Sequence, residues 1–102
     1  MKLPLSIKVA NHVFTVEEWN TNVANANGRF GECDCNELII RIATGHKKSH
    51  ISETLMHEIM HAIFWSYGLK AEDDEERTIT GLAAGLSQVF QDNPQLYEKI
   101  YG

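Results

Sequence analysis

Hydrophobic residues change their spacing about halfway along the chain, and this change limits the folds open to it. Before Thr44 and Gly45 they form short runs rich in β-branched side chains, which are typical of strands. After Ser49 they recur every third or fourth residue, which is typical of amphipathic helices. Strands followed by helices predict an α+β fold, with a small antiparallel or mixed sheet packed on two or three helices.

The first half of the chain contains three predicted strand regions. Residues Ser6 to Trp19 predict a hairpin with its turn at Asn11-His12. An Asn- and Gly-rich loop is expected over Asn20 to Gly31, leading into a short strand over Phe30 to Cys33. The strongest strand signal is Leu38 to Ala43, which turn-forming residues flank on both sides.

Two helices are predicted in the second half. The first has Ser49 or Ser52 as its N-cap and Gly68 as the residue that follows its end. The second begins in the acidic run Glu72 to Glu76, because carboxylates favour a helix N-terminus, and it ends before Pro94. A last helical turn is expected to hold Leu96, Tyr97 and Ile100.

Length and charge narrow the functional classes. A chain of 102 residues predicts a single domain over residues 1–102. Its net charge of −5 argues against nucleic-acid binding, which requires clustered Lys and Arg. It has no apolar run long enough for a membrane span, and its N-terminus lacks the features of a secretory signal, so we expect a cytoplasmic protein.

The segment His57-Glu58-Ile59-Met60-His61 carries the predicted chemistry. Residues four apart lie on one face of a helix, so both imidazoles can reach one ion. Glu58 is offset around the helix and is expected to act as general base on a zinc-activated water. The alternative interpretation is an amphipathic helix with an accidental pair of surface histidines. The motif lies within the best-supported helix, which favours a Zn²⁺ site.

A catalytic zinc ion needs a third protein ligand. No histidine follows His61, so a third histidine further along the chain is excluded, and the ligand is expected among the carboxylates of the second helix. Glu75 and Glu76 lie 14 and 15 residues after His61, where a short turn can fold that helix back over the first. Helix capping explains most of this acidic run, and any one of its five residues can be the ligand.

The segment from Thr54 to Ile63, followed by Glu75-Glu76 and Leu82 to Leu86, resembles small phage and bacterial zinc metallopeptidases of the ImmA/IrrE-like group. The resemblance covers roughly residues 28 to 94 and implies a minimal zincin-like fold of the gluzincin type. It also implies Glu76 as third ligand, with Glu75 in reserve, although Thr78-Ile79-Thr80 departs from the group's usual pattern. An edge strand that pairs with an extended substrate is a further implication, and Leu38 to Ala43 is expected to be that strand.

Two functions from different classes follow. The first is a zinc-dependent endopeptidase that cleaves a protein or peptide substrate, and the resemblance implies a transcriptional regulator as one such target. The second is a non-catalytic zinc-binding interaction protein, in which the metal staples two helices. An intact Glu58 favours the enzyme, because a purely structural site does not need that carboxylate.

Several other polar residues have weaker predicted roles. Cys33 and Cys35 are expected to be plain thiols in or beside a strand, because the chain holds no second pair to complete a zinc site. His50 is predicted to be either an oxyanion donor or an exposed histidine at the helix start. The tyrosines considered as oxyanion stabilisers are Tyr67, Tyr97 and Tyr101.

Overall fold

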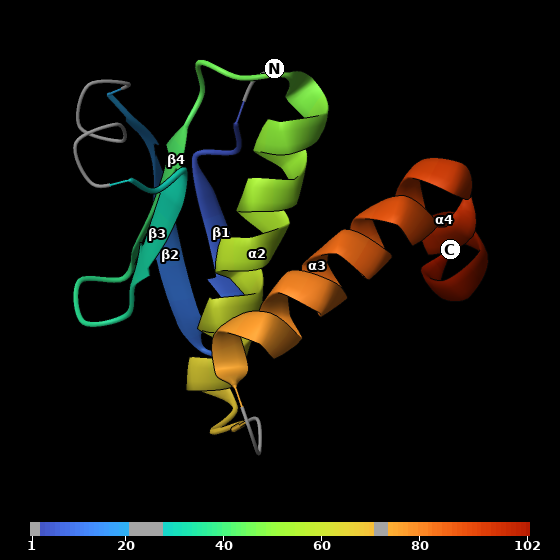
Figure 1. Ribbon diagram of the computed structural model, residues 1–102. Helices are drawn as coiled ribbons and strands as arrows, with labels where there is room; N and C mark the ends of the chain where they lie inside the picture. Colours follow the sequence, from blue (N-terminus) through green and yellow to red (C-terminus); the bar gives the residue numbers. More distant parts are fainter. Residues whose placement is uncertain (1–2, 21–27, 71–73) are drawn as a thin grey trace.

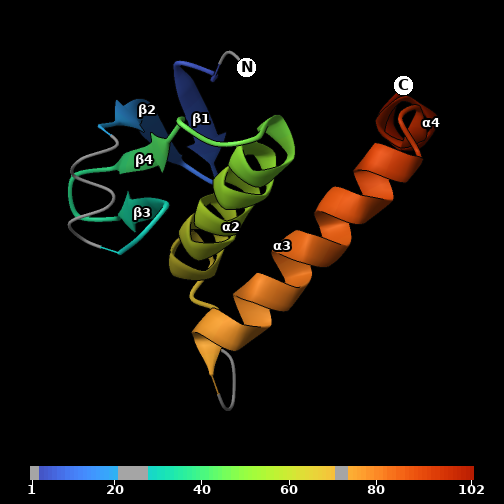
Figure 2. The ribbon, with the colours of Figure 1, turned by 45° about the horizontal axis from the view of Figure 1, so that its top comes forward.

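The structure is a computed structural model that describes residues 3–20, 28–70 and 74–102. It forms three layers (Figures 1 and 2): a four-stranded sheet, helix α2 against one face of the sheet, and helix α3 on the far side of α2. This is the predicted α+β class. Parts of the loop predicted over residues 20–31, and the helix start predicted at Glu72, lie outside the described residues.

The sheet has the strand order β1-β2-β4-β3 and is mixed. Strands β1 (Ser6–Val9) and β2 (His12–Trp19) form the predicted hairpin, with Val9 paired to His12. The two-residue turn is therefore Ala10-Asn11, one residue earlier than predicted, and Ala10 adopts the positive φ of 53° that such tight turns require. Strand β4 (Ile39–Ala43) runs parallel to β2 and antiparallel to β3 (Gly31–Asp34).

Alternation along β2 and β4 builds the main core. Phe14, Ile40 and Ile42 are fully buried and point toward α2, where Ala62 meets them. On the opposite face of the sheet, Arg41 forms ion pairs with Glu17 and Glu32, one from each flanking strand. Inward apolar and outward polar residues in alternation set the register of the three strands.

Helix α2 spans Lys48–Ser66 and is apolar on two faces, because it lies between the sheet and α3. Its N-cap is Lys47, whose side chain makes no capping bond, so the predicted caps Ser49 and Ser52 are wrong and both lie inside the helix. The end at Gly68 is confirmed. Gly68 has a φ of 64°, and the Leu69 N–H donates to the Phe64 carbonyl across a Schellman turn.

That turn leads into α3 (Glu75–Asp92), which begins at its N-cap Asp74 and stops one residue short of Asn93, as the following proline predicts. A second, smaller core of Met60, Phe64 and Ile79 joins α3 to α2. Helix α4 (Leu96–Tyr101) follows at the far end of α3, away from the sheet (Figure 1). None of the helices in the described part of the chain has the length and apolar composition needed to cross a membrane.

Candidate metal centre

The polar side of α2 carries the two motif histidines at the level where α3 begins. His57 and His61 are four residues apart, and their ring centroids lie 4.9 Å from each other. Their Nε2 atoms converge to 3.2 Å. Two imidazole nitrogens that face each other at this distance can both reach one ion, as the i, i+4 spacing predicts.

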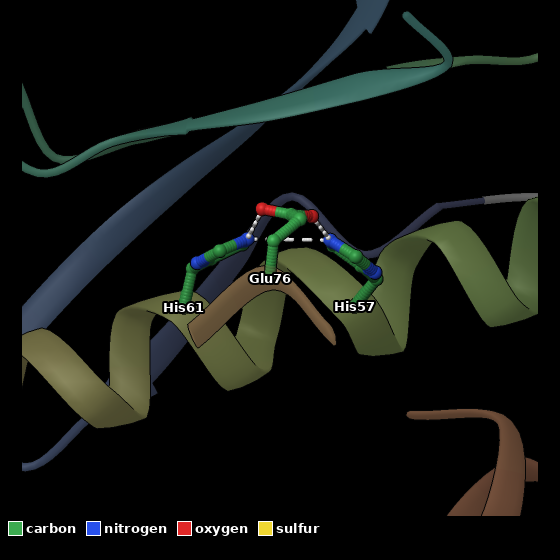
Figure 3. A group of neighbouring side chains, drawn as sticks. All are labelled: His57, His61 and Glu76. Carbon is green, nitrogen blue, oxygen red and sulfur yellow. Dashed lines mark hydrogen bonds and ion pairs between the residues drawn. The ribbon is translucent and has the colours of Figure 1, made fainter. Parts of the chain in front are cut away.

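Glu76 brings a carboxylate to the same point from the first turn of α3 (Figure 3). Its Oε1 lies 2.5 Å from Nε2 of His57, and its Oε2 lies 3.1 Å from Nε2 of His61. All three donor atoms fall within 4.8 Å of one another, and this group could hold a metal ion. The Schellman turn after α2 reverses the chain and so allows the first turn of α3 to reach the histidines.

The spacing of these donors suits a tetrahedral ion. Ligands about 2.0–2.1 Å from a tetrahedral metal lie about 3.3–3.4 Å from each other. The nitrogen–nitrogen distance of 3.2 Å and the His61–Glu76 distance of 3.1 Å are close to this value, while the His57–Glu76 contact is shorter. Two neutral imidazoles and one carboxylate form a donor set that suits a divalent transition metal.

Glu75 lies on the other side of His61. Its Oε1 is 3.3 Å from Nδ1 of His61, while Glu76 faces Nε2 of the same ring. A carboxylate at Nδ1 favours the tautomer in which Nδ1 carries the proton and Nε2 keeps its lone pair for a metal. The two adjacent glutamates therefore have different geometries: Glu76 joins the donor group, and Glu75 orients one of its histidines.

Glu58 is a buried carboxylate, with 7% of its surface exposed. Burial raises the pKa of Glu58 to about 7, and nearby His61 partly opposes this rise. It stands outside the three-donor group but lines the same cleft as His57 and His61. A divalent cation beside it would favour its charged form, because an opposite charge lowers the pKa of a carboxyl.

The cleft that contains these residues has a volume of about 1060 Å³ and runs between β3 and the helices. All of β3, from Gly31 to Asp34, borders it. The prediction that Leu38 to Ala43 is the edge strand is wrong: β4 is flanked by β2 and β3, and β3 is the edge strand on the side of the cleft. The strong apolar signal of β4 reflects its central position, where a strand is covered on both sides.

A glycine allows β3 to approach α2 closely. A Cβ atom on Gly31 would lie 2.9 Å from the Arg41 carbonyl oxygen and 3.0 Å from Cγ2 of Thr54. Any larger residue would push the edge strand away from the helix that carries the histidines. Gly31 therefore determines the width of the cleft at this end.

His50 lines the cleft but lies two helical turns before His57, which is about 10 Å along the helix axis. It is half-buried, stacks edge-on against Phe30 and His46, and its Nδ1 is buried, with no hydrogen-bond partner among the described residues. The structure thus brings it neither to the metal group as an oxyanion donor nor to the surface as an exposed histidine. None of the three tyrosines considered lines the cleft.

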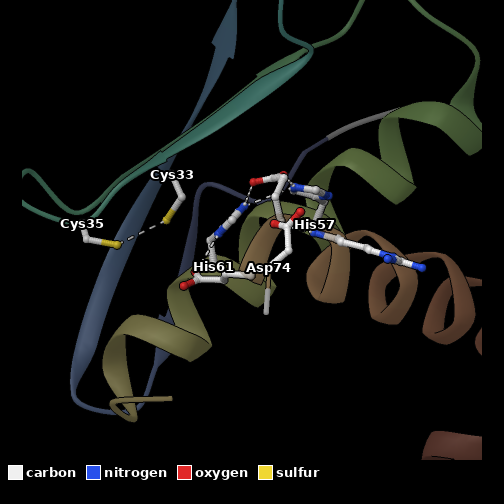
Figure 4. Close-up of polar contacts among 8 residues, drawn as sticks. Cys33, Cys35, His57, His61 and Asp74 are labelled. Carbon is white, nitrogen blue, oxygen red and sulfur yellow. Dashed lines mark hydrogen bonds and ion pairs between the residues drawn. The ribbon is translucent and has the colours of Figure 1, made fainter. Parts of the chain in front are cut away.

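Cys33 and Cys35 are free thiols, as predicted, with Cys33 in β3 and Cys35 just after it. Their sulfur atoms are 3.8 Å apart, and burial raises the pKa of both thiols above the ordinary range. Figure 4 shows both on the strand side of the cleft, across from His61. Sequence reasoning did not place them there, because their position depends on β3 being the edge strand.

Comparisons with known proteins found no protein-family model, no curated protein and no solved structure that this chain matches. The function must therefore be argued from the site itself.

Proposed function

We propose that this protein is a zinc-dependent endopeptidase, in which His57, His61 and Glu76 bind the metal and Glu58 is the general base. One observation carries the proposal. Three donor atoms from two helices converge within 4.8 Å of one another, beside a buried glutamate in an open cleft. The resemblance to the ImmA/IrrE-like metallopeptidases supports the same conclusion.

The donor set favours zinc in a catalytic site over zinc in a structural one. Structural zinc sites usually have four protein ligands, whereas catalytic sites have three and one open position. Within the described residues the converging group has three members, and the cysteines across the cleft are not among them. When bound, zinc would polarise a substrate carbonyl and make water a better nucleophile at neutral pH.

Glu58 has the position that a general base needs. Its neighbour His57 is in the donor group, while Glu58 itself lines the cleft and stands outside that group. It can take a proton from the attacking water and return it to the departing amine. A buried carboxylate whose only task is to stabilise the fold would be paired with a cation or a set of donors, and no described side chain donates a hydrogen bond to Glu58.

An extended peptide suits the cleft because β3 is an edge strand of the sheet that the described residues form. β3 pairs with β4 on one side, and its other side faces the cleft. A peptide that adds to this edge can form main-chain hydrogen bonds, which hold it in an extended conformation beside the metal group. We further propose that the reaction takes place inside the cell, on a protein such as a transcriptional regulator, as the resemblance implies.

The variant Glu58→Gln tests the proposal. Glutamine keeps the shape of the side chain but cannot accept a proton, so peptide cleavage should fall by about 10²–10⁴-fold. Zinc content and melting temperature should stay at their wild-type values, because Glu58 is not in the donor group. Cleavage is measured on a mixed peptide library by mass spectrometry, with the zinc content of each sample determined in parallel.

The variant His61→Ala provides the control and should lose zinc and cleavage together. If zinc-loaded wild-type protein cleaves no more than Glu58→Gln, the endopeptidase proposal is refuted and the non-catalytic zinc protein becomes the better hypothesis. If Glu58→Gln loses its zinc, then Glu58 is structural and the proposed mechanism is wrong.

A further inference from the structure

The cleft has a pronounced excess of negative charge. Six carboxylates line it, from Glu32, Asp34, Glu53, Glu58, Glu75 and Glu76. Among Lys and Arg residues in the described part of the chain, Arg29 alone lines it. An acidic lining by itself can reflect a solvated rim, so the charge partners of each carboxylate decide its role.

Three of the six carboxylates have a positive charge beside them once zinc is bound in the proposed site. Glu32 forms an ion pair with Arg41. Glu58 and Glu76 together would match the two positive charges of a bound zinc ion. Three carboxylates, those of Asp34, Glu53 and Glu75, then remain against the single guanidinium of Arg29. The zinc-loaded cleft therefore keeps two unmatched negative charges.

Asp34 and Glu53 lie toward opposite ends of the cleft. Asp34 ends β3, and its Oδ1 accepts the backbone N–H groups of Asn36 and Glu37 at 3.1 and 3.0 Å, which hold the carboxylate in place. Glu53 precedes Thr54, the α2 residue that lies against the start of β3 at Gly31. Neither carboxylate forms an ion pair within the described part of the chain.

Two further observations favour a ligand in the cleft. The edge of β3 that pairs with no described strand runs along it, and Asp34 and Glu53 both line the same cleft. Glu58, only 7% exposed, opens into the cleft and receives no hydrogen bond from a described side chain. A buried carboxylate of this kind is costly to the fold unless something in the cleft interacts with it.

We propose that the cleft takes an extended peptide segment with a cationic residue on each side of the bond to be cleaved. This inference rests on the proposed endopeptidase function and names its class of substrate. A peptide added antiparallel to β3 has its N-terminal end beside Asp34 and its C-terminal end beside Glu53. Lysine or arginine before the bond therefore meets Asp34, and lysine or arginine after it meets Glu53.

The test measures binding, so it does not require cleavage. Fluorescein-labelled octapeptides of alanine and leucine carry Lys, Gln or Glu near each end, and their affinity for zinc-loaded Glu58→Gln protein is measured by fluorescence anisotropy. One exposed ion pair changes affinity by about 1.5–5-fold, so the peptide with two lysines should bind about 10-fold more tightly than its glutamine counterpart. The difference should shrink severalfold as the salt concentration rises from about 0.02 to 0.5 M.

Single variants show which carboxylate binds the lysine at each end of the peptide. Asp34→Asn keeps the oxygen that accepts the turn N–H groups, and it should abolish the preference for the N-terminal lysine alone. Glu53→Gln should abolish the preference for the C-terminal lysine alone. The matched control is Glu18→Gln with Glu98→Gln, which removes two exposed charges outside the cleft and should leave both preferences unchanged.

The outcomes separate this inference from the proposed function. Equal binding of the lysine, glutamine and glutamate peptides, or a preference that survives Asp34→Asn with Glu53→Gln, overturns the inference even if the library is cleaved. A preference for the lysine peptides that depends on both carboxylates supports it even if no peptide is cleaved, in which case only the endopeptidase proposal fails.

Discussion

Replacing Glu76 or Glu75 with glutamine distinguishes a metal ligand from a residue that only orients one. Glu76 contacts Nε2 of both histidines, whereas Glu75 contacts Nδ1 of His61. Both residues open α3 and have the same charge, so each variant controls for the other's effect on the helix dipole. We expect Glu76→Gln to weaken zinc binding far more than Glu75→Gln does.

The size of the difference follows from the two geometries. A structural zinc site with four ligands has an apparent binding free energy of about 10–16 kcal/mol, or about 2.5–4 kcal/mol per ligand. Loss of the Glu76 ligand therefore predicts about 10²–10³-fold weaker binding. The Glu75 side chain is 46% exposed and 3.3 Å from its partner, and glutamine keeps an oxygen there, so about 2–5-fold is expected.

Competition with a chromophoric zinc chelator measures both affinities, and circular dichroism verifies that each variant is folded. A loss in Glu75→Gln equal to or larger than that in Glu76→Gln would refute the assignment and make Glu75 the ligand. Small effects in both would show that His57 and His61 bind the metal with a different third group.

Three other predictions test the fold around the site. Gly31→Ala should lower the free energy of unfolding by about 1–3 kcal/mol, because its Cβ would lie 2.9 Å from a backbone oxygen. Gly81→Ala in α3 should raise the free energy of unfolding by about 0.5–1 kcal/mol, because no atom lies within 4 Å of the new Cβ. Chemical denaturation measures both changes. Burial raises the pKa of Cys33 above its ordinary value of 9.0, so its alkylation by iodoacetamide should be slower than that of Cys35 and should still accelerate above pH 9. In urea the two thiols should react at the same rate. Mass spectrometry measures the alkylation of each cysteine. Removing zinc with a chelator should speed amide hydrogen exchange in the first turn of α3 but not in β4. The reason is that β4 lies in the main core, whereas α3 is held by the smaller core. Equal exchange with and without zinc would argue against a metal bridge between the helices.

The pair of histidines on one helix could be predicted from the sequence pattern, whereas the choice of the glutamate that joins them from another helix could not. The spacing of His57 and His61 within a strongly periodic segment defines one helix face, and the structure confirms that convergence. Glu75 and Glu76 differ by about 100° around α3, so the choice between them depends on how α3 crosses α2, which sequence patterns do not encode. The local Schellman turn at Gly68 and the long-range packing of Met60 and Phe64 against Ile79 together produce that crossing.

The edge strand was misassigned for a related reason. Leu38 to Ala43 has the strongest strand signal because β4 is central, and its parallel pairing with β2 joins segments far apart in the chain. β3 has a weak signal, with Gly31 and two acidic residues, because an edge strand beside a polar cleft buries little. A weak strand signal beside a polar cleft is thus a better indication of an edge strand than a strong one.

The position of Glu58 connects the folding of α2 to its proposed chemistry. α2 packs one apolar face on the sheet and another on α3, so little of its surface remains for polar groups. The remaining side carries His57, Glu58 and His61, and burial of Glu58 there disfavours its charged form. A cation bound at the histidines would oppose that preference, because an opposite charge in a partly desolvated site favours the charged form of a carboxyl. Metal binding would therefore both join α3 to α2 and convert Glu58 into the charged base that peptide hydrolysis requires.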